Sequence, residues 1–172
     1  MKPFRFCPAC GSSLLEPDGE GGAHCESCDR KWYRNMAPTV GCAIVRGGRA
    51  LIAVRAFEPE KGRIDVPGGF LRLGEDPIEG LKREVSEEIG LEVEVSIEDC
   101  VQMVPHTYGS EDEWVLALGF VGRAPEGEPV PADDVAEVRW VGPEDLDSLD
   151  WAWGHDGDLV RRALAPPSRR RG

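Results

Sequence analysis

The sequence predicts an α+β fold in which a small cysteine-rich module precedes a mixed β-sheet with two or three helices. Three observations predict it. Residues 1 to about 36 hold four of the six cysteines and show little apolar periodicity. From Thr39 onward, strand-sized apolar runs alternate with turns, and residues 76–90 have the spacing of one strong amphipathic helix. We therefore expect a module over 1–36, a main domain over 37–165 and a flexible tail over 166–172.

Two C-x2-C units predict a structural zinc site in the module. Cys7 and Cys10 form the first unit, and Cys25 and Cys28 form the second, 14 residues further on. Two such turns can complete a tetrahedron of thiolates around Zn²⁺, as in a zinc ribbon, and they leave no open position for catalysis. The zinc would instead fold a segment that cannot build a core of its own. A thioredoxin-like redox pair needs only one such unit, and His24 is expected to be a bystander.

Short apolar runs predict the strands of the main domain. Gly47 and Gly48 separate the first two runs and give a hairpin signal. The expected strands are Thr39–Val45, Ala50–Arg55, Leu91–Val95, Cys100–Val104, Val115–Val121 and Val135–Val141. The carboxylates after Pro143 suggest a short helix start, and Asp156–Leu164 is expected to be the last amphipathic helix.

The main helix has clear boundary signals. Asp76 can cap its start, Pro77 occupies the first turn, and Glu79 lies where a capping box would place it. Gly90 is placed to end the helix. The buried stripe, at helical spacing, is expected to be Ile78, Leu81, Val85 and Ile89.

Three carboxylates share a neighbouring face of this helix. Glu84, Glu87 and Glu88 are related by three and four positions, where like charges destabilise a helix by about 0.2–0.5 kcal/mol per pair. They also lie near the C-terminal end, where the helix dipole disfavours anions. A solvated acidic face is one interpretation. The other interpretation is a functional site, because both the spacing and the position of these charges are unfavourable for helix stability. Carboxylate oxygens of this kind suit Mg²⁺ or Mn²⁺ as ligands.

The composition limits the function classes. The 172 residues carry 32 Asp and Glu against 20 Lys and Arg, a net charge of −12, and 41% are hydrophobic. Because non-specific nucleic-acid binding needs clustered cations, nucleic acid is not an expected partner. No apolar run reaches the roughly 18 residues of a membrane helix, and the N-terminus lacks the apolar segment of a secretion signal. We therefore expect a cytoplasmic protein without a membrane partner.

Residues 69–91 resemble the Nudix box, G-x5-E-x7-R-E-U-x-E-E-x-G-U, where U is a bulky aliphatic residue. All seven fixed letters and both aliphatic positions agree: Gly69, Glu75, Arg83, Glu84, Val85, Glu87, Glu88, Gly90 and Leu91. Pro67–Phe70 and Glu137–Trp140 also look like the family, and the resemblance covers residues 39 to about 165. It implies the Nudix α/β/α sandwich. The cysteine module resembles the zinc ribbon of a Nudix subgroup that includes NADH, FAD and ADP-ribose pyrophosphatases.

The resemblance implies metal-dependent hydrolysis of a nucleoside diphosphate linked to another group, by water attack at phosphorus. The implied ligands of Mg²⁺ or Mn²⁺ are Glu84, Glu87, Glu88 and the backbone carbonyl of Gly68. Glu75 and Arg83 look like the pair that fixes the loop to the helix. The general base is either Glu84 or a carboxylate on a later loop, where the candidates are Glu111, Asp112 and Glu113. Asp133 and Asp134 are interpreted as turn residues.

The sequence leaves the substrate open. The expected class is a dinucleotide such as FAD or NADH, or an ADP-ribose-like nucleotide sugar. A nucleoside triphosphate or a dinucleoside polyphosphate is the alternative, and a non-catalytic nucleotide-sensing or RNA-contacting module is the alternative of another class. The candidate substrate contacts are Tyr108, as a base-stacking wall, with Glu111 and Glu113. Since many relatives are dimers, the resemblance also allows a homodimer.

Two further segments have more than one interpretation. Trp151, Trp153 and His155 either pack the last helix against the sheet or cover the substrate cleft. Residues 30–34 mix cations with aromatic residues, which can stack on nucleic acid. Because the net charge is negative, we favour a seam between the module and the main domain for this segment.

Overall fold

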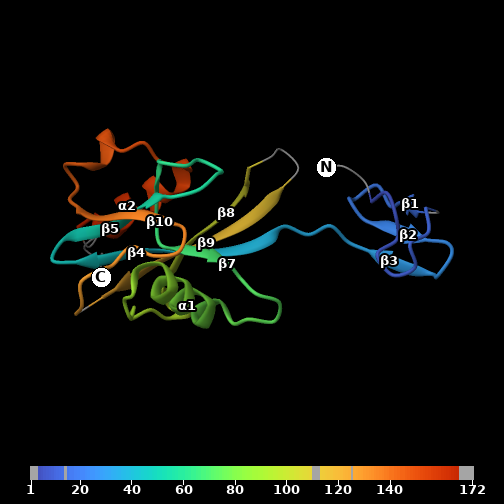
Figure 1. Ribbon diagram of the computed structural model, residues 1–172, viewed down its shortest axis with the longest axis horizontal. Coiled ribbons are helices and arrows are strands. Elements are labelled where there is room, and N and C mark those ends of the chain that lie inside the picture. Colours follow the sequence, from blue (N-terminus) through green and yellow to red (C-terminus); the bar gives the residue numbers. More distant parts are fainter. Residues whose placement is uncertain (1–3, 14, 110–112, 125, 167–172) are drawn as a thin grey trace, which may run out of the picture.

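The cysteine module and the main domain are separate bodies joined by an extended segment in the computed structural model of the protein (Figure 1). The structure describes residues 4–13, 15–109, 113–124 and 126–166. The module is an antiparallel sheet of β1 (Leu15–Pro17), β2 (Ala23–Cys25) and β3 (Arg30–Trp32).

The segment expected to form a seam is the last module strand and the start of the linker. Arg34 does reach the main domain, where it lines a hollow together with Phe70 and Tyr108. Tyr33 beside it is 65% exposed. The segment therefore reaches both the module, through Arg34 over the Phe4 ring, and the main domain, and the expected seam stays a prediction.

A seven-stranded mixed sheet forms the centre of the main domain, in the order β10-β5-β4-β9-β8, with β6 on β5 and β7 on β4. Its strands are β4 (Ala37–Arg46), β5 (Arg49–Arg55), β6 (Ile64–Asp65), β7 (Gly68–Phe70), β8 (Cys100–Thr107), β9 (Trp114–Arg123) and β10 (Val135–Val141). β4 and β9 run parallel, and the other pairs are antiparallel. The β4–β5 hairpin turns at Gly47 and Gly48, both at positive φ, as predicted.

Two helices cover the two faces of the sheet. α1 (Pro77–Ile89) packs on one face and α2 (Gly154–Leu164) on the other, which gives the predicted α/β/α layers (Figure 1). The side chains of β4 alternate between the two cores: Ile44 packs on the α1 side and Ala43 on the α2 side. Two short 3-10 turns, Ile97–Asp99 and Leu146–Ser148, complete the elements.

One predicted strand is absent. Residues 91–95 make a single bridge, from Glu94 to Arg123, and no strand. Leu91 and Val93 are buried, while Glu92 and Glu94 are exposed. This alternation has the period of a strand, although it belongs to an irregular segment lying on the core. Of the predicted tail, residues 167–172 lie outside the described residues. Among the described helices, none has the length and apolar character needed to cross a membrane.

Candidate functional site

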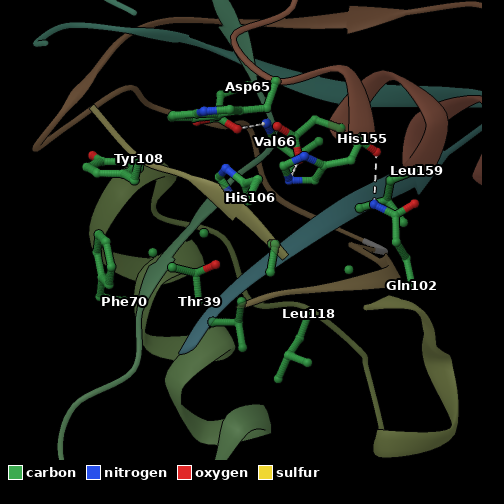
Figure 2. Close-up of a pocket in the computed structure, with 18 of the residues that line it drawn as sticks. Thr39, Asp65, Val66, Phe70, Gln102, His106, Tyr108, Leu118, His155 and Leu159 are labelled. Atoms are coloured by element: carbon green, nitrogen blue, oxygen red, sulfur yellow. Dashed lines mark hydrogen bonds and ion pairs between the residues drawn. The ribbon is translucent and has the colours of Figure 1, made fainter. Parts of the chain in front are cut away.

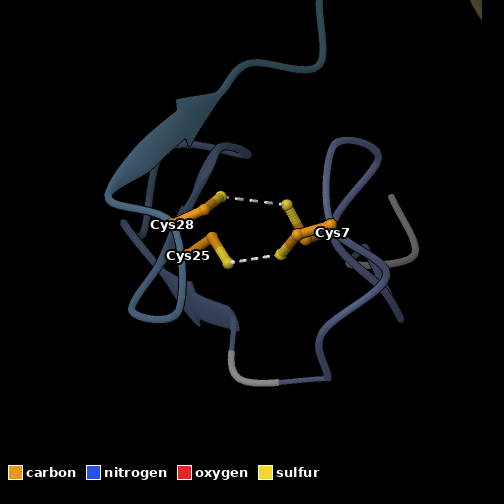
Figure 3. A group of neighbouring side chains, drawn as sticks. Cys7, Cys25 and Cys28 are labelled. Carbon is orange, nitrogen blue, oxygen red and sulfur yellow. Dashed lines mark hydrogen bonds between the residues drawn. The ribbon is translucent and has the colours of Figure 1, made fainter.

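The four cysteines of the module converge on one point (Figure 3). The Sγ atoms of Cys7 and Cys28 are 3.7 Å apart, as are those of Cys10 and Cys25, and all four lie within 4.8 Å of one another. A disulfide needs about 2.05 Å. Sulfurs at about 2.3 Å from a tetrahedral zinc ion lie about 3.8 Å apart, so this thiol cluster fits a four-coordinate structural metal.

His24 is not part of the cluster. Its Nε2 atom lies 2.8 Å from Oδ1 of Asp29. The cluster therefore consists of the four predicted cysteines, and His24 is a bystander as predicted.

Arg83 ties the loop before α1 to the carboxylates on the helix. Its Nε and Nη2 atoms donate to Glu75 at 2.7 and 2.8 Å. Its Nη1 atom donates to Glu84 at 2.6 Å and to Glu87 at 3.1 Å. The hydrogen bonds from Arg83 hold the pKa of Glu75 at about 2. One guanidinium thus compensates part of the repulsion among the carboxylates and fixes their orientation.

Glu88 is buried beneath the loop that precedes the box. It is 5% exposed, and its Oε2 atom accepts a hydrogen bond of 2.9 Å from the backbone N–H of Gly68. Burial raises the pKa of Glu88 to about 10, against the effect of the Gly68 N–H, and Asp134 adds to the rise.

Asp134 is a site residue that the sequence interpretation missed. It lies just before β10 and faces Glu88, and both residues line a small cavity of about 10 Å³ together with Asp65. Its position in a loop with a neighbouring aspartate gives the signal of an ordinary turn. Only the packing of this loop against α1 brings its carboxyl to the site, as the bond from Ala132 N to Glu88 O shows.

Gly68 and Gly69 form a glycine loop that lies against β4 and α1, where a side chain would collide with its neighbours. A Cβ atom on Gly68, at φ +155°, would lie 2.1 Å from the carbonyl oxygen of Val40. A Cβ atom on Gly69 would lie 2.6 Å from the carboxyl carbon of Glu84. Gly68 therefore requires glycine, because backbone atoms of β4 fill the space of a side chain, whereas a side chain at Gly69 would displace the Glu84 carboxylate.

A pocket of about 110 Å³ opens beside this loop, between β4, β8, β9 and α2 (Figure 2). Tyr108 and Trp153 stack at 5.4 Å with an angle of 20° between their planes, and Phe70 meets Tyr108 edge-on at 5.2 Å. His106 and His155 lie with ring centroids 4.4 Å apart at the same pocket. We call Phe70, Tyr108 and Trp153 the aromatic wall.

Arg55 connects the aromatic wall to Asp65, just before the glycine loop. Its Nη1 atom donates to Asp65 at 2.8 Å, and its Nη2 atom donates to the Tyr108 hydroxyl at 3.1 Å. Its guanidinium carbon also lies 4.8 Å from the Trp153 ring centroid. No sequence pattern links Arg55 with Asp65, because the two residues end different strands.

The predicted substrate contacts have different outcomes. Tyr108 lines the pocket, whereas Glu113 lines the separate hollow beside Trp114. Glu111 and Asp112 lie outside the described residues. Of the tryptophan cluster, Trp153 and His155 line the pocket, and Trp151 packs against the core under α2. Trp151 thus packs as the first interpretation expects, and a role of Trp153 and His155 in covering a substrate stays a prediction.

Together, the layered fold and the acidic helix beneath a glycine loop define the class: an α/β/α domain with a hydrolase-type site. The model of the NUDIX domain family matches residues 35–163, and the chain belongs to that family.

Individual relatives agree with this assignment. The chain is 28% identical over 154 residues to the NAD-capped RNA hydrolase NudC of Stutzerimonas stutzeri, covering 87% of this chain and 52% of that protein. It is 30% identical over 149 residues to the NudC of Pseudomonas entomophila, covering 86% and 51%. The chain spans about half the length of these curated relatives. Its fold matches the crystal structure of a NUDIX hydrolase from Nitrosomonas europaea with a TM-score of 0.75, at 24% identity over 94% of this chain and 90% of that one.

Proposed function

We propose that this protein is a metal-dependent pyrophosphohydrolase that cleaves the diphosphate linkage of a dinucleotide or of an ADP-ribose-like nucleotide sugar. One observation carries the proposal: two box carboxylates contact the two glycines that border the pocket. Glu88 accepts from Gly68 N, Glu84 lies against Gly69, and both glycines line the pocket. A substrate ring bound in the pocket would therefore place its diphosphate beside the acidic helix.

The residues that would hold Mg²⁺ or Mn²⁺ are Glu84, Glu87, Glu88, the Gly68 carbonyl and Asp134. Their donor set is all oxygen, and the metal would neutralise the diphosphate and favour water attack at phosphorus. Arg83 and Glu75 position these carboxylates. Since Glu113 lies in a separate hollow and Glu84 lies beside the pocket, Glu84 is the general base that we propose.

The aromatic wall supports a base-bearing substrate. Tyr108 and Trp153 present stacked rings at the pocket, and stacked aromatic residues bind the faces of planar bases. The curated relatives are named NAD-capped RNA hydrolases, which supports a nicotinamide adenine dinucleotide as the small-molecule substrate.

A second candidate substrate is an RNA that carries such a dinucleotide at its end. The net charge predicts that nucleic acid is not a partner. The relatives are named as hydrolases of a capped RNA, so their names do not support that prediction. Arg34, Tyr108 and the 40% exposed Trp114 line a hollow of about 300 Å³ next to the pocket. This cation and these rings would suit the first nucleotides of a single strand.

For the module we propose a structural zinc ion held by the four cysteines. For the whole molecule, homodimerisation stays a prediction of the family resemblance, and light scattering in solution tests it.

The proposed reaction is tested by Glu88→Gln. The amide can still accept from Gly68 N, so the fold is kept, but the ligand charge is lost. With Mg²⁺ and either the dinucleotide NADH or the nucleotide sugar ADP-ribose, we expect turnover to fall by at least about 100-fold. Glu79→Gln is the matched control, because Glu79 lies on the same helix, exposed and paired only with Lys82, and it should keep full activity. Full activity of Glu88→Gln, or of metal-free enzyme in EDTA, would sink the proposal.

A further inference from the structure

The pocket and the neighbouring hollow are separated by two aromatic side chains. Phe70 and Tyr108 line both the pocket of about 110 Å³ and the hollow of about 300 Å³. Their rings meet edge-on with centroids 5.2 Å apart, and both lie at the same end of the pocket (Figure 2). We call this pair the partition, because one cavity lies on each side of it.

The partition is attached to the acidic helix. Phe70 directly follows Gly69, against which the Glu84 carboxylate lies. The backbone carbonyl of Phe70 also accepts a hydrogen bond of 3.4 Å from Nη2 of Arg83. The residues beside the partition are therefore the ones that we propose to act on the diphosphate. A diphosphate bound there would have one of its two substituents in the pocket and the other in the hollow.

The hollow offers aromatic surface that is open to a ligand. Trp114, at the start of β9, lines the hollow and is 40% exposed, and Phe70 is 41% exposed. Aromatic faces that remain open to solvent can stack on a planar base. Arg34 adds a cation to the same hollow, which suits the phosphate of a nucleotide. The lining therefore has the chemistry of a nucleotide subsite.

We propose that the hollow binds the adenine half of the dinucleotide, with Trp114 as the stacking face, while the pocket receives the ring of the other half. The larger cavity is assigned to adenine because a purine has two fused rings and a pyridine has one. The inference rests on the proposed function, since the two rings are the two ends of the proposed dinucleotide substrate. The two cavities together would then favour substrates that carry a ring at each end of the diphosphate.

Calorimetry with AMP and with nicotinamide mononucleotide, in the presence of Mg²⁺, tests the two halves separately. Trp114→Ala should weaken AMP binding at least tenfold and the binding of nicotinamide mononucleotide by twofold or less, because only adenine loses its stacking face. Trp114→Leu, which keeps an apolar side chain without an aromatic face, should behave in the same way. Trp114→Tyr keeps an aromatic face and should bind AMP within about threefold of wild type.

Tyr33→Ala is the matched control. Tyr33 is a 65% exposed aromatic residue of the linker, and it lies outside the described lining of the hollow. This variant should bind both mononucleotides with the affinity of the wild-type protein.

Kinetics with NADH give a second readout. In Trp114→Ala the KM should rise at least tenfold while kcat stays within about threefold, because the carboxylates that we propose as metal ligands are unchanged. If wild-type protein cleaves no dinucleotide, yet Trp114→Ala selectively weakens AMP binding, the hydrolase proposal fails and the inference stands. If NADH is cleaved while folded Trp114→Ala and Trp114→Leu proteins bind AMP like wild type, the hydrolase proposal stands and the inference is overturned. Absent AMP binding by wild type, or an equal loss of affinity for both mononucleotides, would also overturn it.

Discussion

Two arginines organise the polar side chains on either side of the glycine loop. Arg83 joins Glu75 to Glu84 and Glu87 on the acidic helix. Arg55 joins Asp65 to Tyr108 and the aromatic wall. A planar guanidinium donates in several fixed directions at once, which a lysine cannot do. The site therefore depends on two arginines that hold the other polar side chains in place.

The box residues could be predicted because their chemistry is local. Glu84, Glu87 and Glu88 lie within five positions on one helix, so their spacing alone places them on one face. The pocket residues come from different elements: Arg55 ends β5, Asp65 ends β6, and Asp156 lies in α2. No local period links these positions, and only the pairing of the strands brings them together.

At the same scale, His155 makes the protein sensitive to acid. Burial first, and the neighbouring His106 charge second, lower the pKa of His155 to about 4. In the unfolded chain a histidine titrates near 6.5. As the pH falls from about 6.5 to 4, the unfolded chain takes up a proton that the folded protein does not, so stability is lost across this window.

We expect His155→Gln to flatten that part of the stability profile. Urea unfolding midpoints of wild type and variant, measured at intervals from pH 7 to pH 4.5, should converge or cross as the pH falls if the variant is the less stable at neutral pH. They should diverge, with the variant the more stable in acid, if the two are equally stable at neutral pH. Two parallel profiles would show that this imidazole does not carry the effect.

At the scale of elements, α1 owes its start to one side chain. The Oδ1 atom of Asp76 accepts from Ile78 N at 2.8 Å and from Glu79 N at 3.3 Å, as the sequence predicted. The Glu79 side chain pairs with Lys82. Because the helix carries the carboxylates that we propose as metal ligands, fraying of its first turn would loosen Glu75 and Arg83 as well.

Asp76→Ala should destabilise the protein by about 1 kcal/mol, the usual cost of losing an N-cap. For a chain of this size we expect the main melting transition to fall by about 3 °C. Lys82→Ala, on an exposed face of the same helix, is the control and should leave that transition within about 1 °C. A melting temperature unchanged by Asp76→Ala would mean that the cap is dispensable.

Strands were predicted correctly where an apolar run of the sequence also pairs with a neighbouring strand of the sheet. Val135–Val141 was predicted at its observed bounds, and the β4–β5 hairpin at its observed turn. The prediction of a strand over residues 91–95 was wrong because alternate side chains can be buried without a ladder of hydrogen bonds. Parallel pairing of β4 with β9 could not be derived from either strand alone, since the register depends on the chain between them.

At the scale of the whole molecule, the two bodies have separate sources of stability. The main domain has two apolar cores, one on each face of the sheet. In the module, by contrast, Cys7, Ala23 and Cys25 are the buried hydrophobic residues among those described. Metal ligation is therefore the main force that can hold the module together.

Removal of the module metal should unfold the module and leave the main domain folded. We expect Cys25→Ser to abolish bound zinc, measured by atomic emission, and to remove amide-exchange protection over residues 23–32. Protection in β4, β9 and α1 should be unchanged, and the wild-type protein with its zinc is the reference. Loss of protection in both bodies together would show that they fold as one unit.

The parallel pairing of β4 with β9 has a consequence for biosynthesis. The pair extends from Ala37 with Val115 to Val45 with Arg123, and α1 lies in the chain between the two strands. A nascent polypeptide thus carries the acidic helix before it possesses the strand that completes the centre of the sheet. Closing so long a loop costs entropy, which only the contacts between the paired strands compensate. The sheet that positions the helix can therefore form only after Arg123 has left the ribosome.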